Sequence, residues 1–318
     1  MRKALFFIPP FLLTILLLLF SVSDLYATTV DLRHLTFGFY REDWPVIYKD
    51  KILWLDEGIV KGYNFTEQNW FTLFEGEQPL ADLYGLVGFD GRYVAYINAT
   101  DENSFDVNAY DLEEGKNIVI TDKSGTQWAT DYDQKTVIYI DGAPCGNLIA
   151  YNLSNKNSML ITEHACYAKI SGNNIVWAYG NSIYGYYLNR NEQFMITPNG
   201  AHPDIYGNNA IWLSKEEDTT FVNLKNLKTG EERVLNEAED YGITWPAISK
   251  RYVVWGKTTS QHVAGVEGVD LITGEVFEIQ DQGNHQNGVI APQIEGNIVA
   301  WMAWRTGNGD IYAAEINK

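Results

Sequence analysis

Lys169-Ile-Ser-Gly-Asn-Asn-Ile-Val-Trp177 is the segment of the sequence that decides the fold. It joins an apolar residue, a tight polar turn and an apolar strand that ends in an aromatic residue, and this pattern recurs along the chain. The aromatic anchors that end the seven copies are Trp54, Tyr96, Tyr139, Trp177, Trp212, Trp255 and Trp301. Successive anchors are 42, 43, 38, 35, 43 and 46 residues apart, which is the spacing of repeats that each contain four short strands.

Two further strands follow each of the first six aromatic anchors, and one follows the seventh. The first has the two-residue alternation of inward-facing and outward-facing side chains that is typical of a β-strand, as in residues 183–188 and 311–316. A polar turn such as Thr229-Gly230 then leads to the second strand, as in residues 193–197. Each copy is therefore predicted to be a four-stranded antiparallel blade, and seven copies predict an all-β, seven-bladed β-propeller.

The two ends of the repeat region are predicted to share one blade. The seventh copy ends at Lys318 directly after its third strand, whereas residues 30–36 precede the first copy and have the pattern of a fourth strand. We expect this N-terminal strand to complete the last blade, which removes an open sheet edge and allows a stable monomer. The alternative is a six-bladed ring with a separate first repeat.

The repeated motif, together with Gly307-Asn-Gly-Asp-Ile-Tyr312, resembles the TolB-like propeller repeats of secreted and cell-surface proteins. The resemblance covers essentially the whole chain after its leader. It implies the propeller fold more than any one function, because TolB-like propellers include partner-binding modules, enzyme-associated domains and some lyases.

The N-terminus has the order of a secretory signal peptide: Met1-Arg2-Lys3, an apolar run from Ala4 to Phe20, and a short polar stretch. We expect residues 1–27 to be the signal peptide and residues 28–318 to be a single propeller domain, secreted or in the cell envelope. A retained membrane anchor is the alternative. The run is shorter than the ~20 residues of a spanning helix and contains Pro9-Pro10, so cleavage without membrane insertion is favoured.

The charge of the chain excludes several classes of partner. The formal net charge is −18, and without residues 1–27 the chain has 21 basic and 40 acidic residues. Nucleic acid and anionic membrane surfaces are therefore poor partners. The two cysteines, Cys145 and Cys166, fall in loops of the third blade that reach the same face, and we expect them to form a disulfide in an oxidising compartment.

The longer loops of such blades are expected on one face of the ring, called here the loop face, and the tight turns on the opposite turn face. The residue at the start of each inner strand looks into the mouth of the central channel on the loop face. At four blades it is a large, stackable residue, which suits a sugar or an apolar side chain of a protein partner. These predicted ligand-binding residues are Trp44, Tyr167, His202 and Trp245. The alternative is that they only pack blade against blade.

Four histidines also fall on the predicted loop face: His164, His202 and His285 in loops that enter inner strands, and His262 in another loop. Some seven-bladed relatives that cleave oligogalacturonate hold a metal at such a mouth with several histidines. The spacing here is not that of metal ligands, so solvent-exposed loop histidines explain the pattern more simply. The acidic residues Asp204, Glu216, Glu217 and Asp218 are acid or base candidates, but loop acids are usually solvated.

Common enzyme motifs are missing from the sequence. It has no Gly-x-Ser-x-Gly, no His-Glu-x-x-His, and no phosphate-binding or dinucleotide-binding fingerprint. We therefore expect a non-catalytic, cofactor-free binding or scaffold propeller whose protein or carbohydrate partner meets the loop face. The alternative is a metal-assisted polysaccharide lyase or hydrolase, which needs at least three of the four mouth histidines to converge.

Overall fold

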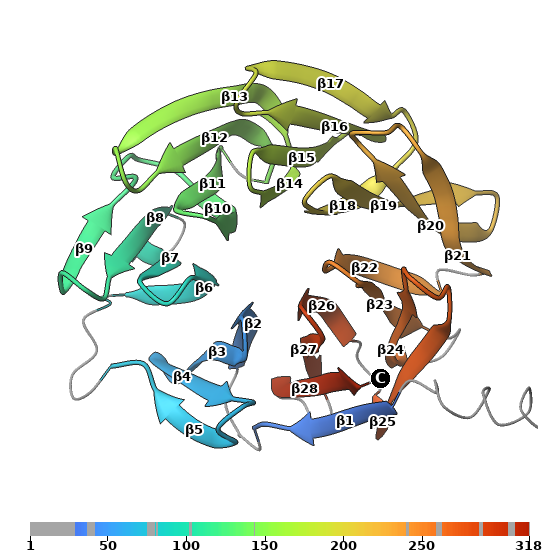
Figure 1. Ribbon diagram of the computed structural model, residues 1–318. Coiled ribbons are helices and arrows are strands. Elements are labelled where there is room, and N and C mark those ends of the chain that lie inside the picture. Colours follow the sequence, from blue (N-terminus) through green and yellow to red (C-terminus); the bar gives the residue numbers. More distant parts are fainter. Residues whose placement is uncertain are drawn as a thin grey trace, which may run out of the picture.

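The computed structural model describes residues 29–36, 42–74, 80, 82–101, 104–142, 144–239, 242–258, 263–285, 289–304 and 309–317. These residues form seven four-stranded antiparallel sheets arranged as blades around a central channel (Figure 1). From the inner to the outer strand, the blades are β2 (Glu42–Tyr48), β3 (Lys51–Asp56), β4 (Ile59–Asn64) and β5 (Asn69–Thr72) in blade 1; β6 (Leu83–Phe89), β7 (Tyr93–Asp101), β8 (Ser104–Asp111) and β9 (Lys116–Val119) in blade 2; β10 (Gln127–Asp133), β11 (Thr136–Asp141), β12 (Gly146–Asn152) and β13 (Asn157–Ala165) in blade 3; β14 (Tyr167–Ser171), β15 (Asn174–Tyr179), β16 (Ser182–Tyr187) and β17 (Glu192–Thr197) in blade 4; β18 (Ala201–Tyr206), β19 (Asn209–Glu216), β20 (Thr219–Asn226) and β21 (Glu232–Glu239) in blade 5; β22 (Ile243–Ile248), β23 (Tyr252–Thr258), β24 (Val263–Asp270) and β25 (Val276–His285) in blade 6; and β26 (Val289–Glu295), β27 (Ile298–Trp304), β28 (Gly309–Asn317) and β1 (Thr29–His34) in blade 7.

The N-terminal strand closes the ring. β1 pairs antiparallel with β28, from Thr29 opposite Asn317 to His34 opposite Tyr312. The Leu35 N–H extends this ladder by donating to the Ile311 carbonyl over 2.8 Å. Figure 1 shows the blue β1 beside the red β28. The predicted seven-bladed ring and its closure are confirmed, and the six-bladed alternative is wrong.

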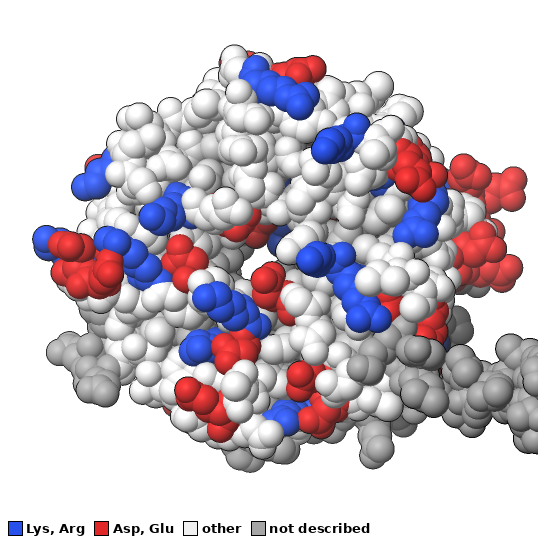
Figure 2. Space-filling model, in the orientation of Figure 1, with Lys and Arg blue, Asp and Glu red and all other residues white. Residues whose placement is uncertain are grey.

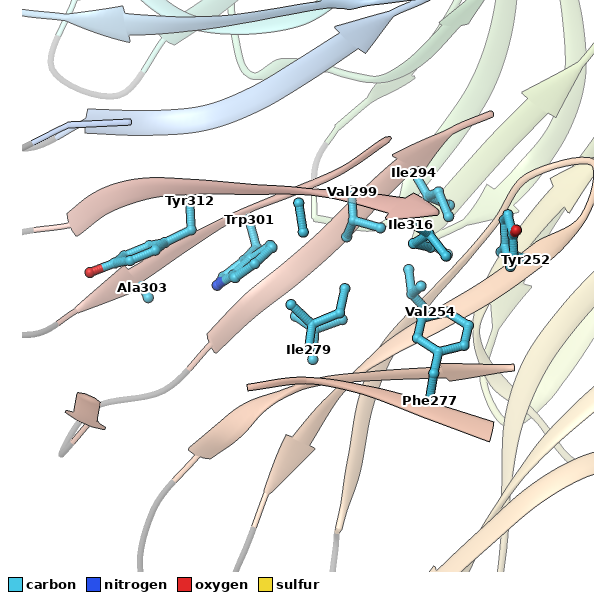
Figure 3. Close-up of a cluster of buried hydrophobic side chains, with 13 residues drawn as sticks. Tyr252, Val254, Phe277, Ile279, Ile294, Val299, Trp301, Ala303, Tyr312 and Ile316 are labelled. Atoms are coloured by element: carbon cyan, nitrogen blue, oxygen red, sulfur yellow. The ribbon is translucent and has the colours of Figure 1, made fainter. Parts of the chain in front are cut away.

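The hydrophobic core is divided into clusters that lie between neighbouring blades. One cluster joins Val254 and Phe277 of blade 6 to Val299, Trp301 and Tyr312 of blade 7 (Figure 3). All seven predicted aromatic anchors are buried, because each lies on the second strand of its blade where the next sheet covers it. The repeat thus exists because one blade cannot bury its own faces and needs a neighbour on each side.

The surface and the centre of the ring differ in character. Figure 2 shows basic and acidic side chains interspersed on the viewed face, and a hollow at the centre of the ring with both acidic and basic side chains near its edge. Within the described residues, no helix has the length and apolar character needed to cross a membrane.

Candidate functional site at the channel mouth

The inner strands are interrupted where they begin, at the loop face. Four of them carry a residue followed by proline: Trp44-Pro45, His202-Pro203, Trp245-Pro246 and Ala291-Pro292. At each pair the register with the second strand shifts. Proline has no N–H to donate to the ladder, so the strand forms a bulge there that turns side chains out of the regular alternation.

The backbone at three of these bulges is strained. His202, Trp245 and Ala291 have φ angles of 51°, 40° and 27°. A non-glycine residue rarely has a positive φ, and a residue before proline usually adopts an extended conformation. Such strain is of order 1–3 kcal/mol per residue and collects at ligand sites, where the surrounding structure holds it.

Three of the four predicted ligand-binding side chains lie together. The ring centroids of His202 and Trp245 are 4.0 Å apart, and Tyr167 lies 5.5 Å from Trp245 and 6.1 Å from His202. These residues come from the inner strands of three adjacent blades and form what we call the His202 cluster. Burial lowers the pKa of His202, so its imidazole is neutral at neutral pH. Trp44 begins the bulge in β2, but its side chain lies outside the described residues.

A second aromatic cluster was not predicted from the sequence. Tyr84, Phe105 and Trp128 have ring centroids 4.6 to 5.7 Å apart, and we call them the Trp128 cluster. Tyr84 is 38% exposed and Trp128 is 36% exposed, although both are large. In blades 2 and 3, the residues at the repeat position that was expected to face the mouth are Leu86 and Ala129. Both are buried instead.

Register shifts explain this difference. In β6 the pairing shifts between Leu83 and Gly85 and again between Leu86 and Gly88, and in β10 it shifts between Ala129 and Asp131. A shift of one residue exchanges the two faces of a strand, so a fixed offset from the anchor does not find the side chain that faces the mouth. The sequence did contain a signal for this cluster. Tyr84 and Trp128 are large aromatic residues near the start of inner strands, shortly before the expected positions Leu86 and Ala129.

Both clusters line a single cavity of about 610 Å³, here called the mouth cavity. Tyr84 and Trp128 contribute from one cluster, and Tyr167 and Trp245 contribute from the other. The volume lies within the range of about 300–1,000 Å³ that is common for small-molecule sites. Its aromatic walls offer stacking area with little side-chain entropy to lose.

A buried ion pair forms the floor of the mouth cavity. The Lys169 ammonium lies 3.7 Å from the Asp131 carboxylate, and their side chains are 12% and 20% exposed. Asp131, Lys169 and Gln293 also line a second cavity of about 480 Å³ that continues toward the turn face, so they separate the two spaces. Asp131 accepts the Ile170 N–H over 2.9 Å, which joins blade 3 to blade 4.

Asp204 is the second carboxylate near Lys169. It accepts the Ile248 N–H over 2.9 Å, and this bond joins blade 5 to blade 6. Desolvation by burial raises the pKa of Asp131, and it raises the pKa of Asp204 to about 6. Burial alone would lower the pKa of Lys169, but the charge of Asp131 and the other acidic groups around it outweigh burial and raise that pKa.

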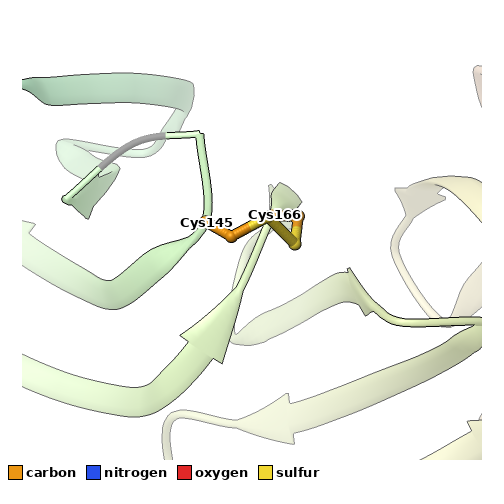
Figure 4. Close-up of a disulfide and its surroundings, with 2 residues drawn as sticks. All are labelled: Cys145 and Cys166. Carbon is orange, nitrogen blue, oxygen red and sulfur yellow. A yellow bond between two sulfur atoms is a disulfide. The ribbon is translucent and has the colours of Figure 1, made fainter.

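The predicted disulfide is present at the edge of the mouth cavity. Cys145 and Cys166 are bonded, with Cα atoms 4.0 Å apart (Figure 4). Cys166 lines the cavity and directly precedes Tyr167 of the His202 cluster. Its N–H donates to the Ala178 carbonyl over 2.9 Å. The disulfide therefore fixes the backbone from which Tyr167 projects.

The candidate metal ligands are distributed differently from the expectation. His164 lies within β13 rather than in a loop, because this strand continues to Ala165, which pairs with Gly146. The centroid of its ring lies 5.0 Å from that of Tyr179, on which it stacks. The ring partners of His202 are different residues, Tyr167 and Trp245. His285 ends β25, where it pairs with Val263, but its side chain is not described, and His262 lies outside the described residues.

No group of three or more histidine, cysteine or acidic side chains able to hold a metal occurs among the described residues. The metal hypothesis for His262 and His285 stays a prediction. Of the acidic candidates, Asp204 lies in the channel, whereas Glu216, Glu217 and Asp218 are exposed at the turn between β19 and β20.

Comparisons with known proteins agree on the fold. No protein-family model matches the chain, and no curated protein matches its sequence. Solved structures that are similar include an oligogalacturonate lyase in complex with manganese (11% identity, 91% of each chain covered, TM-score 0.60) and an oligogalacturonate lyase from Vibrio parahaemolyticus (11% identity, 92% and 98% covered, TM-score 0.61). The β-propeller domain of the Trilobed protease from Pyrococcus furiosus is also similar (11% identity, 89% and 96% covered, TM-score 0.63).

The protease domain has an open velcro topology, whereas β1 closes the ring in the present chain. At 11% identity these likenesses establish architecture and not activity. By fold, the chain is a seven-bladed β-propeller.

Proposed function

We propose that this protein is a secreted, non-catalytic binding propeller of the TolB-like type, whose carbohydrate or protein ligand binds in the mouth cavity. The observation that carries the proposal is that two separate aromatic clusters line the same cavity. Large aromatic side chains that stay partly exposed in a concave site are typical of ligand recognition.

Two further observations support the proposal. The disulfide is consistent with an extracellular or periplasmic compartment. The bulge at Trp245 holds its side chain in the cavity lining, and the bulge at His202 holds its ring against Trp245, despite backbone strain at both residues; this is understandable if the side chains serve a ligand.

An array of glycans and peptides, probed with the chain that begins at Thr28, identifies the ligand. Replacing Trp245 by Ala is then expected to weaken binding by more than about 1 kcal/mol, because an anchoring aromatic residue is lost. Trp70→Ala is a matched control, since Trp70 is 54% exposed on the outer strand β5. Binding that survives Trp245→Ala, but fails when residues around Glu216 or His262 are changed, would move the site to the rim.

A metal-assisted polysaccharide lyase or hydrolase is the second candidate. A histidine, His202, that contacts the cavity-lining Tyr167 and Trp245, and the likeness in fold to two oligogalacturonate lyases favour it. The experiment is metal analysis of the purified protein combined with an assay for unsaturated products from oligogalacturonate. Bound manganese and activity that is lost in His202→Ala would replace the binding proposal by the enzyme.

A further inference from the structure

We propose that the ligand of the mouth cavity is a neutral oligosaccharide of at least two sugar rings, held between the Trp128 cluster and the His202 cluster. This inference rests on the proposed function, because it names the ligand class of the same site. We base it on the charges, the aromatic walls and the size of the cavity.

The charges of the cavity disfavour an acidic ligand. Among the described residues that line it, the charged ones are Asp131 and Lys169. They pair with each other, and Asp204 adds a second carboxylate to the surroundings of Lys169. The single ammonium is thus already matched by acidic groups. A uronate or phosphate group entering the cavity would find no spare cation in the described lining, because the Lys169 ammonium is already paired with Asp131.

The walls of the cavity suit the faces of sugar rings. An aromatic ring has a negative face and a positive edge, so it attracts the C–H groups that cover the flat side of a pyranose. Each cluster presents two rings to the cavity at an angle: 73° between Tyr84 and Trp128, and 56° between Tyr167 and Trp245. Thr126, Thr130 and Gln293 line the cavity and supply neutral hydrogen-bonding groups for sugar hydroxyls.

The size of the cavity favours a short chain of sugars over a single sugar. A volume of about 610 Å³ is larger than one monosaccharide fills, and the two clusters come from different blades. A proline-rich peptide also docks on aromatic surfaces, but it does so in grooves that recognise an extended backbone. The mouth cavity is instead a concavity with a polar floor at the centre of a ring.

The binding surface is preorganised. Proline follows His202 and Trp245 and fixes the bulges that carry them, and the Cys145–Cys166 disulfide holds the chain beside Tyr167. Little flexibility is therefore lost when a ligand binds, which favours recognition of a ligand with few strong contacts.

Isothermal titration of the chain that begins at Thr28 tests the inference. The probes are the neutral hexamers cellohexaose, xylohexaose and maltohexaose, the monosaccharides glucose and xylose, hexagalacturonate and a proline-rich peptide. We expect at least one neutral hexamer to bind, and its monosaccharide and hexagalacturonate to bind at least about tenfold more weakly. Trp128→Ala and Trp245→Ala should each weaken the neutral hexamer by at least about fivefold, with Trp70→Ala unchanged.

The outcomes separate the two proposals. Hexagalacturonate or the peptide binding best, with dependence on Trp128 and Trp245, would overturn the neutral-oligosaccharide inference and leave the mouth as the binding site. Binding of any probe that ignores both tryptophans would overturn the proposed function itself. A folded protein, verified by circular dichroism, that binds none of the probes would also overturn the inference.

Discussion

Lys169 lies where the mouth cavity meets the cavity on the turn-face side, between Asp131 and Asp204. We expect Lys169→Met to destabilise the fold by roughly 3 kcal/mol, at the lower end of the range for a broken buried pair because the channel admits some water. The reason is that two buried carboxylates lose their counter-charge. Denaturant unfolding of the wild-type protein and the variant measures the loss.

Adding Asp131→Asn to Lys169→Met should restore part of this stability, since one unpaired charge is removed. Equal stability of the wild-type protein and Lys169→Met would mean that water in the channel already solvates the two acids.

Asp204 gives a prediction about pH. Its pKa in the folded protein is about 6, above the ordinary value of 3.8, because burial disfavours the charged carboxylate. Between about pH 4 and pH 6 the folded state holds a proton that the unfolded state has released, so this group lowers stability as the pH rises. Asp204→Asn should therefore reduce the decline in stability from pH 4 to pH 7.

Unfolding midpoints of both proteins across this range provide the measurement. The slopes are compared rather than the absolute values, because Asn can no longer accept both the Ile205 and the Ile248 N–H. Parallel curves would contradict the assignment.

The charged floor could have been predicted from the repeat. Eight positions before the seven anchors, in chain order, stand Val46, Gly88, Asp131, Lys169, Asp204, Ala247 and Gln293. Equivalent positions of adjacent inner strands meet around the channel, so an Asp, Lys, Asp sequence in consecutive blades indicates a buried charge network. Tyr167, His202 and Trp245 were predicted by the same reasoning, whereas Tyr84 and Trp128 were not selected because bulges break the fixed offset.

At the scale of single elements, each inner strand with a proline bulge is irregular where it begins, at the loop face, and pairs regularly where it ends, toward the turn face. The strands themselves could be predicted, because alternation and turn residues extend over several positions. The bulges could not, since their positions depend on how each inner strand pairs with its neighbour. The proline after His202 or Trp245 indicates only that the ladder is interrupted.

The disulfide links Cys145, in the loop before β12, to Cys166, which lies directly before β14. Replacing both cysteines by serine should lower stability by about 3 kcal/mol, because the bridge spans 21 residues of chain that become free in the unfolded state. Denaturant unfolding checks the value, and ligand affinity should also fall because Tyr167 loses its fixed neighbour. Wild-type protein unfolded under reducing conditions is the matched comparison, and it should behave like the double variant.

At the scale of the whole molecule, closure by β1 is expected to stabilise the entire ring. Val30 and Leu32 pack against the cluster between blades 6 and 7, and β28 loses its outer partner when β1 is removed. Deleting residues 28–36 should therefore lower the midpoint of thermal unfolding for the whole domain rather than loosen one end.

The chain that begins at Thr28 is the control for this deletion. An unchanged midpoint, measured by calorimetry, would show that the seventh blade is stable with three strands.

The architecture is the part of the protein that the sequence predicts most completely. Seven anchors at similar spacing determine the number of blades, and residues 30–36, which have the pattern of a fourth strand, indicate how the ring closes. The predicted signal peptide at residues 1–27 lies outside the described residues and stays a prediction.

The register of the closing ladder also determines how the molecule can be mounted on a support. Thr29 lies opposite Asn317, at the end of the ladder farthest from His34 and Gly309. Inner strands begin at the loop face, so both Thr29 and Asn317 lie toward the turn face. A bead, a sensor chip or a fusion partner attached at Thr29 or at Asn317 will therefore leave the mouth cavity facing outward, and copies immobilised through either of these two residues will present it in the same orientation.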